Sequence, residues 1–284
     1  MPIATALLGL SLAAEPTVRL EVLDPGQEPR SALSAQPAVG TTDVVTYNVR
    51  FTAEVVNEGI SLPSATLPSL QLRLRSEVKQ AADGSVRAAI TVPSVSVGSD
   101  SDALDDDVRA AAEKAMRPIT KVVGMVSVDA FGALKGAEWS TSDDTAVEAG
   151  LVSELERALD LLLVRRPAEP LGEGARWTVT RSGTDAMGFQ TTDVETWTLS
   201  SVGSEGWTLD LTTLQQAEVP QQIGGSTLQS HTGAAQGQAT LDPAHLFPTK
   251  VELGLSLRTR MLLEGAVRST TTSTLQAEAV RTAE

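Results

Sequence analysis

Acid–base chemistry near neutral pH most often uses histidine, and the chain contains two, His231 and His245. Hydrolysis by a nucleophilic Ser or Thr needs such a base beside it, and the body of the chain has no G-x-S-x-G elbow. Asp242 precedes His245 by three residues, a spacing typical of a capped turn. His231 lies in the polar segment Ser230-His231-Thr232, so we expect it at the surface. We therefore predict no catalytic residue and a protein that is not an enzyme.

A run of acidic residues offers a second kind of chemistry, because calcium binds several carboxylate oxygens at one point. The run comprises Asp100, Asp102, Asp105, Asp106 and Asp107. Its spacing does not match an EF-hand, since Leu104 stands where a ligand is needed and no Gly follows in the required place. Acidic residues at the start of a helix are favoured by the helix dipole. The run is therefore interpreted as a helix start, and no metal ligand is predicted.

Two other types of site find little support in the residues. The segment Gly224-Gly225-Ser226-Thr227 lacks the Lys and the following helix of a phosphate-binding P-loop. A glycosidase-like pair of carboxylates can form between any two strands, so the sequence leaves that possibility open. Aromatic residues, which sugar sites generally use as stacking platforms, make up only 3% of the chain. A hydrolase is therefore the least favoured function, and no cofactor is predicted.

Strict alternation of apolar and polar residues is the main structural signal around these residues. The clearest runs are Val45, Tyr47, Val49, Phe51 and Val55; Leu70, Leu72, Leu74 and Val78; and Leu253, Leu255, Leu257, Met261 and Leu263. Successive side chains of a strand point to opposite faces, so each run describes a strand with one apolar face. With the turn signals between runs, the pattern predicts strands at 17–23, 44–57, 67–80, 85–97, 119–131, 175–183, 189–202, 206–218, 227–241, 248–263 and 266–281, and a short strand within 132–139.

Two segments have helical spacing instead. The first is expected at about 102–117, ending before Pro118, and the second at about 145–165. The second carries a wide apolar stripe that needs a sheet to cover it. Strands of a dozen residues twist and coil strongly. The sequence thus predicts an α+β fold: a large curved antiparallel sheet or incomplete barrel with two inserted helices, the longer one against the concave face.

The N-terminal segment Ile3 to Ala14 is apolar, too short to cross a bilayer, and ends in small residues. It resembles the hydrophobic region of a signal peptide, although no basic residue precedes it; a buried strand or helix is the alternative. We therefore expect a signal peptide at 1–14 and an exported protein, periplasmic or extracellular. Residues 15–43 are expected to form a strand and a linker.

Residues 44–284 are expected to form a single β-rich domain. A G-A-x-W pattern occurs at Gly136 and again at Gly174, which admits two related halves, 44–140 and 174–281, joined by the helix at 145–165. The formal net charge of -14 disfavours nonspecific binding to nucleic acid or to an anionic bilayer. We expect no nucleic acid partner and no membrane span.

The most specific motif of the chain is the segment Pro167-Ala168-Glu169-Pro170-Leu171-Gly172-Glu173-Gly174-Ala175-Arg176-Trp177. With the order of elements around it, the motif resembles a group of uncharacterised secreted bacterial proteins in which a leucine-rich helix precedes such a segment. The resemblance covers roughly residues 44–281 and implies an exported β-rich domain of unknown function, without catalytic or binding residues. The prolines suit the end of a helix, and Trp177 suits a core anchor at the start of a strand.

Two noncatalytic functions fit these patterns. The first is an envelope protein that binds an apolar ligand or lipid between the sheet and the longer helix, by analogy with half-barrel lipid and lipoprotein carriers of the periplasm. Its apolar wall would comprise Leu151, Leu155, Leu159 and Leu162. The second is a structural or protein-interaction module with a closed core, whose Thr-rich face at Thr270, Thr272 and Thr274 meets water or a partner. Both require the same apolar strand faces, so the sequence does not separate them.

Overall fold

The computed structural model describes residues 17–97, 106–141, 146–184, 188–203, 206–263 and 267–282, and its strands join one antiparallel sheet. The strands are β1 (Thr17–Asp24), β2 (Thr42–Asn57), β3 (Ile60–Ser61), β4 (Ala65–Thr66), β5 (Leu70–Ala82), β6 (Ser85–Val97), β7 (Val123–Asp129), β8 (Leu134–Ser140), β9 (Arg176–Thr184), β10 (Gln190–Gly203), β11 (Gly206–Ala217), β12 (Gln221–Ile223), β13 (Ser226–Leu241), β14 (Lys250–Leu262) and β15 (Arg268–Thr282). The antiparallel, strand-rich architecture expected from the alternation is confirmed.

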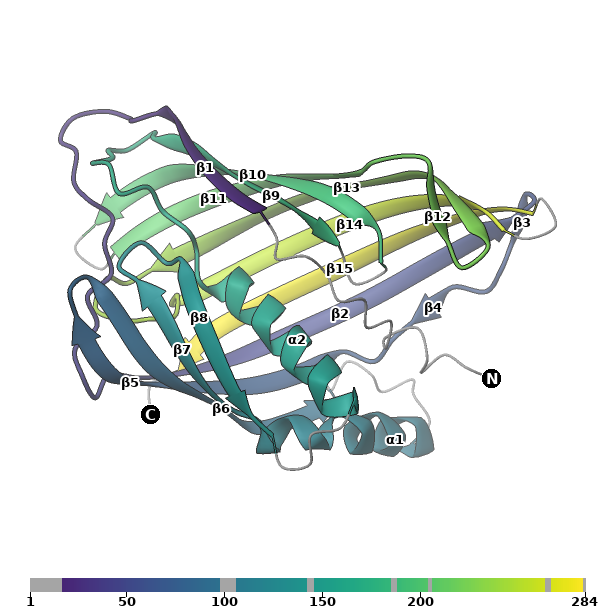
Figure 1. The fold of residues 1–284 in the computed structure, drawn as a ribbon, viewed down its shortest axis with the longest axis horizontal. Helices are drawn as coiled ribbons and strands as arrows, with labels where there is room; N and C mark the ends of the chain where they lie inside the picture. Colours follow the sequence, from purple (N-terminus) through teal and green to yellow (C-terminus); the bar gives the residue numbers. More distant parts are fainter. Residues whose placement is uncertain are drawn as a thin grey trace.

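The sheet is open and strongly curved. Its strand order is β1-β9-β10-β11-β13-β14-β15-β2-β5-β6-β7-β8, with the short β12 beside β13 and the short β3 and β4 beside β2. The two end strands, β1 and β8, each pair with one neighbour, so the sheet does not close into a barrel. Figure 1 shows the long strands β13, β14, β15 and β2 in the middle, with both ends of the sheet folding toward the viewer.

The helices are α1 (Asp106–Met116) and α2 (Ala146–Leu162), and α2 lies across the concave side of the sheet (Figure 1). Asp106 and Asp107 lie in the first turn of α1, as the helix-start interpretation requires; Asp100, Asp102 and Asp105 lie outside the described residues. Within the described parts of the chain, no helix is both long and apolar enough to span a membrane.

The strand expected from residue 119 begins later. A 3-10 helix, η3 (Arg117–Lys121), follows α1, and β7 starts at Val123. The proline ring of Pro118 fixes a φ value that suits the first turn of a helix. The chain therefore makes one further tight turn, which buries Ile119, before it extends. The prediction of an extended chain at 119–122 was wrong for this reason.

The described residues form three apolar clusters that stabilise the fold. The largest packs α2 against β2 and β5 to β7; its fully buried members include Leu155, Leu159, Leu74 and Ile90. The second gathers three tryptophans, Trp177, Trp197 and Trp207, from β9, β10 and β11. The third is small and comprises Phe189, Ala217 and Leu228. Trp177 is fully buried and its indole N–H donates to the carbonyl oxygen of Arg165 at 3.0 Å, which confirms its role as a core anchor.

Candidate ligand site on the concave face

The register of the long central strands decides which side chains share the concave face. Leu255 of β14 lies opposite Leu275 of β15, and Leu275 lies opposite Phe51 of β2. Directly opposed residues in an antiparallel sheet present their side chains on the same face. The residues beside them in sequence, such as Ser256 and Thr274, are exposed on the other face. The three apolar side chains therefore form one row across three strands.

We define the apolar strip as five half-buried residues of this region: Phe51, Val55, Leu255, Leu257 and Leu275. Leu275 packs against the largest cluster, whereas the other four belong to none of the three clusters formed by the described residues. Core strand positions are normally buried completely, so this strip differs from the part of the sheet that α2 covers. It is apolar surface that the described core does not use.

Next to β2, the apolar strip extends into the edge segment, which we define as residues 59–69. Ile60 lies opposite Asn57, and the backbone N–H groups of Leu62 and Leu67 donate to the carbonyl oxygens of Val55 and Phe51 at 2.9 and 3.0 Å. The register places Ile60, Leu62 and Leu67 on the same face as the strip. These side chains are 69%, 45% and 40% exposed. The apolar surface thus runs from the centre of the sheet to an open rim.

The opposite flank of the concave face is polar. We define the polar wall as five residues of β9, β10 and β11 that occupy inward-facing positions in register with the strip: Arg181, Asp193, Glu195, Thr213 and Gln215. Arg181 and Glu195 form an ion pair whose side chains are each only 15% exposed. Glu195 also accepts a hydrogen bond from the indole N–H of Trp197 at 3.1 Å. The concave face therefore presents an apolar flank and a charged flank.

Small residues in β13 bring the two flanks together. A Cβ atom on Gly233 would lie 2.5 Å from a methyl carbon of Leu257 and 3.2 Å from the Cβ atom of Gln215. Leu257 belongs to the apolar strip and Gln215 to the polar wall, so the two flanks meet over this glycine. Glycine within a strand often marks a close approach of neighbouring groups. A side chain here would push the flanks apart.

A small cavity lies between the end of α2 and the polar wall. Its volume is about 30 Å³, and its lining includes Tyr47, Leu162, Arg165, Arg181, Glu195 and Trp197. Space of this size accommodates about two water molecules. Of the four leucines of the expected apolar wall, Leu162 borders this cavity, and all four are buried: Leu151 is 8% exposed, Leu155 1%, Leu159 0% and Leu162 1%. They pack in the largest cluster.

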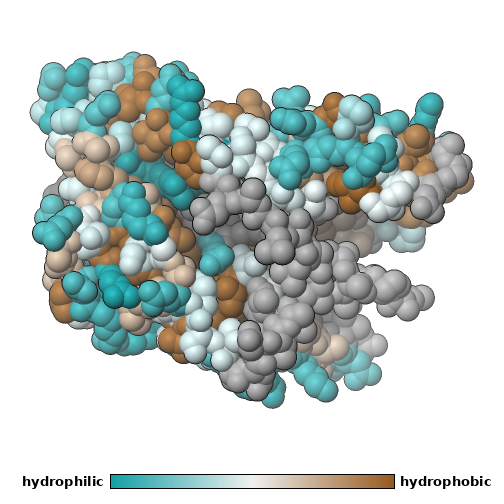
Figure 2. All heavy atoms as spheres, in the orientation of Figure 1, coloured by the Kyte–Doolittle hydropathy of each residue, from teal (hydrophilic) through white to brown (hydrophobic). Residues whose placement is uncertain are grey.

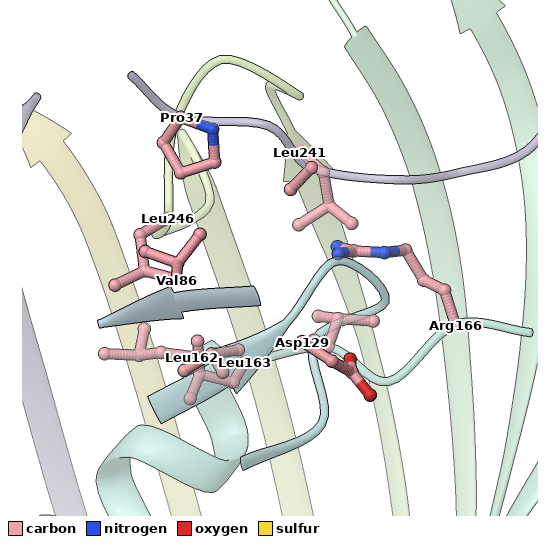
Figure 3. A pocket seen from close by; sticks show the side chains of 12 residues that line it. Pro37, Val86, Asp129, Leu162, Leu163, Arg166, Leu241 and Leu246 are labelled. Atoms are coloured by element: carbon pink, nitrogen blue, oxygen red, sulfur yellow. The ribbon is translucent and has the colours of Figure 1, made fainter. Parts of the chain in front are cut away.

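A second cavity, of about 10 Å³, lies at the C-terminal end of α2, where Arg166 extends toward Leu241 (Figure 3). The guanidinium of Arg166 donates to the carbonyl oxygen of Ala130 at 3.0 Å and lies 5.6 Å from the ring centre of Trp207. Burial lowers the pKa of Arg166 to about 10, while the nearby charge of Asp129 opposes that shift. This arginine joins the β7–β8 turn to the tryptophan cluster.

The two histidines occupy different environments. His231 is 1% exposed, its Nδ1 lies 2.8 Å from the hydroxyl oxygen of Thr259, and its ring packs against Phe189. The expected surface position of His231 is therefore wrong, because its strand turns that side chain toward the concave face. The capped turn at His245 is confirmed, since Asp242 accepts the backbone N–H of Ala244 at 3.0 Å.

Sequence reasoning missed the edge segment and the polar wall. A signal for the wall exists: Arg181, Asp193 and Glu195 occupy the same alternation positions as the buried Val179 and Trp197. Charged residues at inward positions are unusual and mark a polar site inside a sheet. The edge segment is marked by the lack of charged residues between Gly59 and Ser69.

Hydrophobic residues reach the surface at the right-hand end of Figure 2, where Figure 1 places β3 and β12.

Comparison of the chain with protein-family models and with curated proteins gives no match. The candidate site is therefore interpreted from its own residues.

Proposed function

We propose that the protein is a noncatalytic binding protein for an amphipathic ligand, held on the concave face of the sheet. The apolar part of the ligand lies on the apolar strip, and its polar part lies toward the polar wall. The observation that carries this proposal is the register of β9 to β15 and β2, which places the strip and the wall side by side on one face.

The apolar strip supports the proposal through its partial burial. Phe51, Leu255 and Leu257 retain exposed surface although they point into the curve of the sheet. Covering apolar surface stabilises a complex by about 25 cal/mol per Å², so an acyl chain or another apolar group gains free energy here. Extended apolar surface on a soluble protein commonly marks a binding site.

The polar wall supports the amphipathic character of the ligand. Moving an ion pair such as Arg181 and Glu195 out of water costs desolvation free energy, and the attraction between the two charges often offsets only part of this cost. Such a pair therefore often contributes little to stability. A few polar groups within an otherwise apolar site usually orient a ligand. We therefore assign the wall to the polar group of the ligand.

A closed structural or interaction module is the second candidate, and the small cavities favour it. The two cavities bordered by Leu162 have volumes of about 30 and 10 Å³, too small for a lipid tail between α2 and the sheet. The proposed ligand therefore lies on the strip beyond α2 and not on the four helix leucines. The signal-like segment Ile3 to Ala14 supports export to the cell envelope for either candidate.

The test is native mass spectrometry of the protein exported from a bacterial host, with organic extraction of any adduct and titration with a fluorescent fatty-acid analogue. The double variant L255S/L275S changes two opposed residues of the strip. We expect an adduct on the natural protein and about tenfold weaker probe binding by the variant. The control S256A/T274A changes an opposed pair on the other face of the same strands and should bind normally. A natural protein without adduct or probe binding would leave the closed module as the function.

A further inference from the structure

The edge segment has a composition that its exposure does not explain. Residues 59–69 read Gly-Ile-Ser-Leu-Pro-Ser-Ala-Thr-Leu-Pro-Ser and include no charged residue, in a chain with 58 charged residues, 22 basic and 36 acidic. All residues from 59 to 67 are exposed. A segment that only meets water has no reason to exclude charge and to expose Ile60, Leu62 and Leu67.

The apolar side chains of the edge segment lie on one face. Ile60, Leu62 and Leu67 share the concave side with Phe51 and Val55, as the register and the two backbone hydrogen bonds require. Ser61 and Thr66 lie opposite Val56 and Thr52, on the other side. The segment therefore has an apolar face and a hydroxyl face. Such a division suits contact with one apolar surface.

The prolines of the segment argue against a protein strand as its partner. Pro63 lies between β3 and β4, and Pro68 follows β4. Proline has no N–H to donate, and its presence at a sheet edge prevents the regular ladder that an added strand needs. Strand addition along this edge is therefore disfavoured, and side-chain contact with a surface is favoured.

We propose that the edge segment docks on the surface of an uncharged, zwitterionic lipid bilayer. This inference rests on the proposed function, because the apolar face of the segment continues directly into the apolar strip. Uncharged residues enter the bilayer interface without the desolvation penalty of an ion. The net charge of -14 repels an anionic bilayer, so a neutral one fits better. A ligand that leaves the bilayer here reaches Phe51 and Val55 without crossing water.

The test is flotation of the full-length protein with phosphatidylcholine vesicles. The triple variant I60S/L62S/L67S removes the apolar face of the segment, and we expect at least about tenfold weaker vesicle binding. The control L23S/V202S/L214S removes three apolar side chains that are similarly exposed, at 51%, 40% and 66%, on other strands, and it should bind like the natural protein. All three proteins share the same N-terminus, so Ile3 to Ala14 contributes equally to each.

Equal flotation of the triple variant and the natural protein would overturn the docking proposal, as would binding that requires anionic lipid. Titration with the soluble fatty-acid analogue separates this result from the proposed function. If the triple variant binds the probe but not vesicles, both proposals are supported. If L255S/L275S binds the probe like the natural protein while the triple variant loses vesicle binding, the docking surface is retained and the ligand strip is rejected.

Discussion

Asp43 and His245, 202 residues apart in the sequence, are joined by a 2.5 Å hydrogen bond between Oδ1 and Nδ1. The other oxygen of Asp43 accepts the backbone N–H groups of Leu246 and Phe247 at 2.9 and 3.0 Å. Arg281 donates to Asp242 of the same loop at 2.9 Å. These contacts tie the start of β2 to the loop after β13 and to the end of β15. They hold together the strands that carry the apolar strip.

Replacement of Asp43 by Ala is expected to lower the free energy of unfolding by about 3 kcal/mol. Asp43 is 1% exposed, so its loss leaves the partly buried donors of His245 and Leu246 and the buried N–H of Phe247 without their acceptor. Urea denaturation at neutral pH measures the change. Glu54→Ala, on an exposed position of the same strand, is the control and should change stability by less than about 0.5 kcal/mol. A loss below about 1 kcal/mol for Asp43→Ala would contradict the structural role.

The stability of the protein is expected to fall as the pH drops below about 4. Burial alone would raise the pKa of Asp129, but the ammonium of Lys135 and the backbone N–H groups of Ala133 and Phe131 outweigh it and hold that pKa below its ordinary value. Asp242 behaves similarly: burial opposes ionisation, while the Ala244 N–H and Arg281 lower the pKa. A pKa that is lower in the folded state gives stability above the unfolded value, and this stability disappears as the pH falls through the folded value.

Unfolding of Asp129→Asn at pH 7 and pH 3 tests this dependence. The variant lacks the charge that Lys135 stabilises, so the difference from the natural protein should be largest at pH 7 and should shrink toward pH 3. Glu54→Gln, on the exposed face of β2, should follow the natural protein at both values. A difference for Asp129→Asn that stays constant with pH would show that its charge does not contribute.

The substitution Gly124→Ala is expected to destabilise the protein by about 1–3 kcal/mol. A Cβ atom on Gly124 of β7 would lie 2.2 Å from the ring of Trp139 on the adjacent β8. That ring cannot move freely, because its N–H donates to Glu156 of α2 at 2.8 Å. Thermal unfolding measures the loss. Gly136→Ala on β8, where a Cβ atom meets nothing within 4 Å, is the matched control and should remain near natural stability. Equal stability of both variants would mean that the ring shifts at no cost.

The alternation of apolar residues predicted the long strands well, because most of them carry apolar side chains at several alternate positions of one face. The strand β6 at 85–97 has the predicted limits, and β13 and β14 differ from theirs by one or two residues. The short strands β3, β4 and β12 were missed, since two or three residues show no periodicity. They form only because a long neighbouring strand offers its backbone groups.

The candidate site depends on register, which local sequence does not contain. The leucines of α2 have strong helical spacing, so they were predicted as the ligand wall, whereas the structure packs Leu155 and Leu159 fully into the core. Gln215, Gly233 and Leu257 lie opposite one another on three strands, and no local pattern states which strands are neighbours. Likewise, His245 forms its hydrogen bond with Asp43, which lies 202 residues away in the sequence.

The charge of Glu195 provides the sharpest test of the polar wall. Glu195→Gln keeps the size of the side chain and an oxygen that can accept the indole N–H of Trp197, but it removes the negative charge of Glu195 beside Arg181. If the wall contacts the polar group of the ligand, affinity for an anionic amphiphile should rise by about three- to tenfold and affinity for a cationic one should fall similarly.

Binding of an uncharged hydrocarbon probe should not change, because the apolar strip is intact. Isothermal titration with the three ligands measures these effects, and Glu278→Gln, exposed on the outer face of β15, is the control. Equal changes for all three ligands would indicate a general loss of structure, and unchanged binding of both charged amphiphiles would remove Glu195 from the site. Opposite shifts for the two charged ligands that exceed those of Glu278→Gln would show that their polar groups lie close to Glu195, because a distant charge acts on both ligands only weakly.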